Sequence, residues 1–85
     1  MDRIAEIIAR MRANPGDIRF SEAKRVCDHF FGQPRQNGTS HCVYRMPWPG
    51  DPRVNIQRGE SGKAKPYQVR QIIRAIDRLE GENAS

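Results

Sequence analysis

The chain has 85 residues, of which 36% are hydrophobic and 29% are charged, and its net charge is +5. This length suits one domain with a modest core, and the composition excludes a membrane-spanning segment. Because charged residues interrupt the first apolar positions, we expect no signal peptide, a cytoplasmic location and two free cysteines.

The first part of the chain predicts two helices. Apolar residues recur at the spacing of one helical face in residues 1–13 and again in residues 21–31. The two sets are Ile4, Ile7, Ile8 and Met11, and Ala23, Val26, Cys27, Phe30 and Phe31. An Asn-Pro-Gly stop at residues 14–16 ends the first helix. Ser21 is predicted to cap the second helix, and Gly32 to end it with a left-handed backbone.

The apolar period then changes to two residues, which predicts strands. Cys42, Tyr44 and Met46 alternate with His41, Val43 and Arg45. A second strand over Arg53–Gln57 places Val54 and Ile56 on one side, after a rigid proline-rich loop at residues 47–52. A weaker strand at Gln33–Asn37 is confined to a sheet edge by its proline.

Pro66 is predicted to begin the last helix, at the first-turn position that proline favours. Its buried stripe consists of Val69, Ile72, Ile73, Ile76 and Leu79. Arg70, Arg74 and Arg78 form a row four residues apart on another face, where Asp77 could partly neutralise Arg74. The tail at residues 81–85 is predicted to be flexible.

These elements predict an α+β fold, a small three-stranded antiparallel sheet packed on helices. Their α-β-β-β-α order is also that of double-stranded RNA-binding domains, here with an extra helix at the amino terminus.

Positive charge concentrates in the second half of the sequence. Residues 33–78 carry nine basic and three acidic side chains, whereas residues 1–32 carry six and five. Twelve of the fifteen basic residues are arginine, whose planar guanidinium suits phosphate. We therefore expect nucleic acid as the partner, with a solvated basic surface that binds nothing as the alternative.

Three short stretches mark the boundaries of the predicted elements. They are Phe20-Ser21-Glu22 at a helix start, Arg35 with Gly38-Thr39-Ser40-His41 at a strand entrance, and Lys65-Pro66 before the last helix. Together they resemble the HicA toxins, small bacterial proteins of type II toxin–antitoxin systems. The resemblance covers about residues 18–79, and the Gly-Thr-Ser-His turn is its most specific part.

The resemblance implies a double-stranded-RNA-binding-like fold and an endoribonuclease that cleaves mRNA without a metal or other cofactor, inhibiting translation. It assigns catalysis to His41, with Gly38 and Ser40 shaping the turn, and implies neutralisation by a HicB-type antitoxin. Residues 17–80 would form the HicA-like core, after an extra helix and turn at residues 1–16. The basic residues that we expect to bind RNA are Arg35, Arg45, Arg58, Lys63, Lys65, Arg70, Arg74 and Arg78.

The chemistry of RNA cleavage favours a histidine independently of the family. Cleavage at the 2′-hydroxyl needs one group that removes a proton near neutral pH and another that protonates the leaving oxygen. Histidine, with an ordinary pKa of about 6.5, suits both tasks. No second acid or base is evident in the sequence, and His29 is predicted to be a surface residue of its helix.

Other sites are less favoured by the pattern. Cys27 and His29 point to different faces of a helix, and the adjacent His41 and Cys42 to opposite faces of a strand, so we expect no zinc site. Trp48 is predicted to fold back onto the sheet, with stacking on a base as the alternative. Two other functions remain open: a non-catalytic double-stranded-RNA-binding module, and a basic adaptor that docks an acidic protein.

Overall fold

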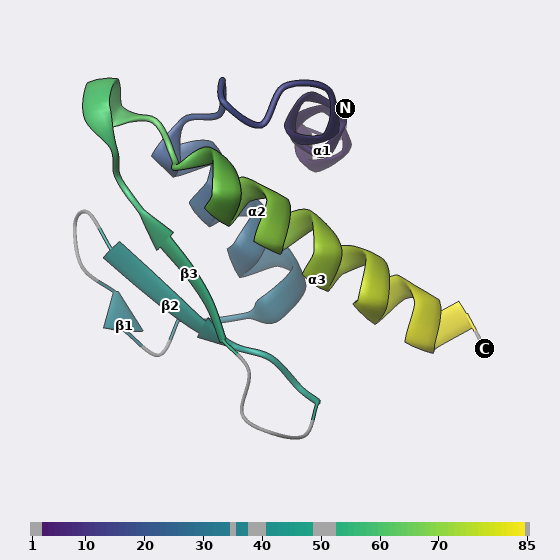
Figure 1. Cartoon of the computed structure of the whole chain (residues 1–85). Helices are drawn as coiled ribbons and strands as arrows, with labels where there is room; N and C mark the ends of the chain where they lie inside the picture. Colours follow the sequence, from purple (N-terminus) through teal and green to yellow (C-terminus); the bar gives the residue numbers. More distant parts are fainter. Residues whose placement is uncertain (1–2, 35, 38–40, 49–52, 85) are drawn as a thin grey trace.

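The structure is a computed structural model, and it describes residues 3–34, 36–37, 41–48 and 53–84. These residues form an α+β fold in which helices cover an antiparallel sheet (Figure 1). The helices are α1 (Arg3–Ala13), α2 (Phe20–Phe31) and α3 (Pro66–Ala84), with a 3₁₀ turn, η1 (Glu60–Gly62), before the last. The strands are β1 (Gln36–Asn37), β2 (His41–Arg45) and β3 (Arg53–Gln57). The expected α+β class is confirmed.

The sheet is built around β2 and β3, which pair antiparallel over five residues each. His41 lies opposite Gln57 at one end, and Arg45 lies opposite Arg53 at the other. The short segment β1 pairs with the other edge of β2, at the end of the predicted Gln33–Asn37 strand. Within the described residues, β3 therefore forms an edge of the sheet.

All three helices lie on one side of this sheet (Figure 1). α2 packs on β2 and β3, α3 packs on β3, and α1 covers α2 and α3. The predicted apolar faces meet in one core, which includes Met11, Val26, Cys27, Cys42, Tyr44, Ile56, Ile72 and Ile76. The extra amino-terminal helix therefore shares its core with the rest of the described fold.

The start of α2 differs from the prediction, because Ser21 does not cap the helix. Phe20 is buried and already helical, which places Arg19 at the cap position and leaves Ser21 exposed in the first turn. Glu22 takes the capping role instead: its carboxylate accepts a hydrogen bond from the Arg19 backbone N–H at 3.0 Å. At the other end, Gly32 has a φ of +79°, which confirms the predicted positive-φ stop.

Two expectations about α3 also differ from the structure. Asp77 binds Arg12 of α1 through two hydrogen bonds, the shorter at 2.6 Å, and so ties α1 to α3 rather than neutralising Arg74. The backbone is helical through Ala84, beyond Gly81 where a flexible tail was expected. None of the described helices combines the length and the apolar character that a membrane crossing requires.

Candidate functional site

His41 lies at the first position of β2 and is half-buried. Its neighbours Cys42 and Tyr44 are fully buried under the helices. Since side chains alternate along a strand, Cys42 faces the helices and His41 faces the opposite side of the sheet. No described helix covers that side (Figure 1). We call this side of β2 and β3 the open face.

Cross-strand pairing shows which residues share the open face with His41. Gln57 lies directly opposite it, and Asn55 lies opposite Val43. Val43 is buried at 5% exposure although it lies outside the main core cluster, so the open face is not uniformly accessible.

The far end of the open face carries two arginines in direct opposition. Arg45 and Arg53 are partners across β2 and β3, and both are exposed. This pairing brings two guanidinium groups close together on the open face. Arg45 is four residues from His41, which corresponds to about 13 Å along a strand. The open face thus combines a histidine at one end with a concentrated positive charge at the other.

Two of the predicted phosphate-binding residues lie on the helical side instead. The Arg58 guanidinium stacks on the ring of the buried Phe20 at 5.3 Å. Lys63 forms an ion pair with Asp17 at 2.9 Å. Arg58 and Lys63 line a hollow of about 300 Å³ together with Arg19, Ser21 and the η1 turn. The structure therefore places this positive charge beside the start of α2, although Arg58 directly follows Gln57, the cross-strand partner of His41.

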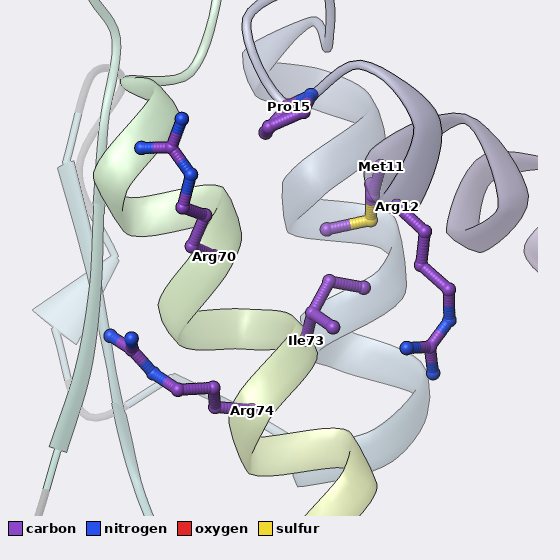
Figure 2. A pocket seen from close by; sticks show the side chains of 6 residues that line it. All are labelled: Met11, Arg12, Pro15, Arg70, Ile73 and Arg74. Carbon is purple, nitrogen blue, oxygen red and sulfur yellow. The ribbon is translucent and has the colours of Figure 1, made fainter.

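The arginine row of α3 forms a further basic surface. Arg70, Arg74 and Arg78 are all exposed. Figure 2 shows the Arg70 and Arg74 side chains extending from α3 on the side remote from α1. The same two arginines and Arg12 also line a hollow of about 400 Å³ between α1 and α3, whose apolar part is formed by Met11, Pro15 and Ile73 (Figure 2).

The remaining candidates fall into three groups. His29 is exposed on α2, where its ring contacts Phe30 edge-on at 5.0 Å, and α2 lies on the opposite side of the sheet from His41. Lys65 is half-buried and occupies the position directly before α3. The predicted turn residues Gly38 and Ser40, and the predicted RNA-binding residue Arg35, lie outside the described residues.

The nucleophilic side chains of the core are in surroundings that lower their reactivity. Burial raises the pKa of Cys27 and, to a lesser degree, of Cys42, which disfavours both thiolates. Burial, together with a 2.6 Å hydrogen bond from its hydroxyl to Asp28, also raises the pKa of Tyr44. Among the described residues, no group of three His, Cys, Asp or Glu side chains is placed to hold a metal ion.

Two residues of the site were missed by the sequence reasoning. Arg53 escaped notice although it alternates with Asn55 and Gln57 on the polar side of its strand, a signal that the sequence contains. Gln68 had no such signal, because it lies beside the apolar stripe of α3, yet it is buried and its Oε1 accepts a hydrogen bond from the Gln57 backbone N–H.

Comparison with protein-family models, with curated proteins and with solved structures finds no match to this chain.

Proposed function

We propose that the protein is a HicA-like toxin, a metal-independent endoribonuclease that cleaves mRNA and uses His41 for proton transfer. The observation that carries the proposal is the position of His41 at the end of the open face, outside the core and with Arg45 and Arg53 on the same side of the sheet. A chain of RNA lying along this face would meet a proton-transfer group and positive charge together. The double-stranded-RNA-binding-like arrangement belongs to the same proposal.

The reaction proposed at His41 is cleavage by the RNA's own 2′-hydroxyl. The imidazole removes the 2′-hydroxyl proton, the 2′-oxygen bonds to the adjacent phosphorus, and the bond from phosphorus to the 5′-oxygen breaks. A proton from the imidazolium formed in the first step, or from water, then passes to that 5′-oxygen, which yields a 2′,3′-cyclic phosphate and a 5′-hydroxyl end. Guanidinium groups near the path of the backbone stabilise the charge that develops on the phosphate.

Incubation of purified protein with a long mRNA, with and without a chelator, tests this function. We expect fragments with 5′-hydroxyl ends, at the same rate in both reactions. Intact RNA in both reactions, or cleavage abolished by the chelator, would contradict the proposal.

The proposed partner in the cytoplasm is a HicB-type antitoxin that covers the open face. Carboxylates facing Arg45 and Arg53 would give fast, salt-dependent association. Co-expression with the product of the adjacent gene is therefore expected to give one complex on gel filtration at low salt. Two separate peaks at low salt would count against the toxin–antitoxin assignment.

A non-catalytic RNA-binding module is the second candidate function. It is favoured by the placement of Arg58 and Lys63 in a basic hollow beside the start of α2, whose lining does not include His41. Under this function, RNA binds with a strong dependence on salt but is not cut. A basic adaptor for an acidic protein would instead bind RNA no better than other polyanions.

A further inference from the structure

A second basic hollow lies at the end of the sheet remote from His41. It has a volume of about 250 Å³ and opens between α3 and the far end of β3. Arg53, Arg74, Arg78 and Gln71 supply its polar groups, and Met46 and Ala75 are among its apolar residues. No acidic side chain is among its described lining residues.

Trp48 gives this hollow a fixed wall. The indole is half-buried and packs against the core, as the sequence predicted. The Arg78 guanidinium stacks over its ring at 4.4 Å, a cation–π contact that restrains a side chain of high rotational freedom. A guanidinium above an aromatic ring retains N–H donors that can reach phosphate oxygens.

The two other arginines approach from different elements. Arg53 begins the edge strand β3, so that a side chain assigned to the open face by strand alternation also lines this hollow at the edge of the sheet. Arg74 lies one helical turn before Arg78 on α3. Each guanidinium has five N–H donors, so an arginine that stacks or hydrogen-bonds elsewhere retains donors for a ligand. Arg74 forms no ion pair within the described part of the chain. Three guanidinium groups around one hollow suit an anion with several oxygens.

We propose that this hollow binds one phosphate-bearing nucleotide unit, with the phosphate at Arg53, Arg74 and Arg78 and the sugar or base at the apolar residues. Pockets that enclose drug-sized ligands measure roughly 300–1,000 Å³, so this smaller hollow fits one unit of a chain rather than a whole cofactor. This site rests on the proposed RNA-directed function. It would hold the RNA several nucleotides away from the position where His41 cleaves it.

Trp48 is the only tryptophan in the chain, so tryptophan fluorescence reports directly on this site. The parent protein is titrated with a short RNA carrying 2′-O-methyl groups, which the proposed reaction cannot cut, while tryptophan fluorescence is recorded. Parallel titrations use a nucleoside monophosphate and the same nucleoside without phosphate. We expect a saturable change with the RNA, a weaker one with the monophosphate and none with the nucleoside.

Arg74→Gln is the test variant, and Arg25→Gln is its matched control. Arg25 is an exposed arginine on α2 that lines none of the three hollows described above. Loss of a charged hydrogen bond to phosphate is expected to weaken RNA binding about tenfold in Arg74→Gln. Arg25→Gln should bind like the parent.

The outcomes separate this site from the proposed function. RNA that binds in a gel shift without changing Trp48 fluorescence, or equal weakening by both variants, would overturn the site and leave cleavage untouched. A saturable change in Trp48 fluorescence in a protein that does not cut RNA would support the site and contradict the nuclease function. A full fluorescence change with the monophosphate and none with RNA would overturn RNA as the ligand. The hollow would then be a phosphate site for free nucleotides.

Discussion

The backbone N–H of Gln57 donates a hydrogen bond to the side-chain Oε1 of Gln68 at 2.7 Å. Gln57 ends β3 opposite His41, and Gln68 is only 3% exposed on α3. A buried amide thus satisfies a polar group at the outer edge of β3, where no further strand pairs with it in the described sheet. The last helix thereby fixes the end of the strand pair that carries the candidate catalytic histidine.

Gln68→Met should therefore destabilise the protein. The substitution keeps a side chain of similar size but removes the acceptor, leaving the Gln57 N–H unsatisfied at a cost of about 1–3 kcal/mol. Urea unfolding measures the loss, and faster hydrogen exchange of the Gln57 amide locates it. Gln71→Met, at a half-buried glutamine of the same helix, serves as control and should change stability by less than about 0.5 kcal/mol. Equal losses in both variants would show that the hydrogen bond contributes nothing specific.

His41→Ala should abolish RNA cleavage while leaving the fold and RNA affinity intact. Loss of a general acid or base lowers the rate by roughly 10²–10⁴-fold, whereas binding depends mainly on the arginines. The rate of fragment formation and the growth of cells expressing the protein give the readouts. His29→Ala is the matched control, since His29 lies on α2 on the other side of the sheet, and it should cut like the parent. Undiminished cutting by His41→Ala would remove the histidine from the mechanism and favour the binding module.

Apolar periodicity in the sequence predicted most of the fold. The three helices and the strand Arg53–Gln57 follow from it, because burial of an apolar face depends on spacing along the chain. The helix start at Phe20 was missed, since a local preference for Ser21 as a cap gave way to the burial of Phe20 in the core. The Arg12–Asp77 pair was equally hidden, because 65 residues separate its members.

The candidate site was only partly predictable for a related reason. The strand pattern correctly placed His41 and Arg45 on one side of the sheet. Charge counts, in contrast, do not show toward which side of the sheet a side chain extends. Arg58 was therefore grouped with His41, although its guanidinium stacks on Phe20 of α2. The contact between Trp48 and Arg78 joins residues thirty positions apart and follows from tertiary packing alone.

The arginine row of α3 should contribute to RNA binding through phosphate contacts. Replacing Arg70 and Arg74 together with glutamine removes two exposed positive charges. The slope of log affinity against log salt should then become shallower by about 1.4, or 0.7 for each contact to a single strand, without a change in sequence preference. The matched double variant replaces Arg3 and Arg25, two exposed arginines on α1 and α2, and should keep the parental slope. Identical slopes in the two double variants would show that the row is only a solvated surface.

Glu22 should make the protein sensitive to acid. Its carboxylate accepts hydrogen bonds from the Arg10 guanidinium, the shorter at 2.6 Å, and from the backbone N–H of Arg19. These contacts, the Arg10 hydrogen bond foremost, hold the pKa of Glu22 below its ordinary value of 4.5. Because the folded pKa is the lower one, the ionised carboxylate stabilises the protein above about pH 4.5, and this contribution is lost as the pH falls through the folded value.

Glu22→Gln tests this linkage between α1 and α2. Glutamine retains an oxygen for the cap but loses the ion pair, so we expect a loss of about 0.5–1 kcal/mol at pH 7. The difference from the parent should shrink as the pH is lowered from 5 to 3, because the parent then loses the same charge. Urea unfolding at each pH measures it. Glu60→Gln removes an exposed carboxylate in η1 and is the control. Its free energy of unfolding, plotted against pH, should run parallel to that of the parent. A Glu22→Gln curve that also stays parallel to the parent would show that the Arg10 pair does not contribute to stability.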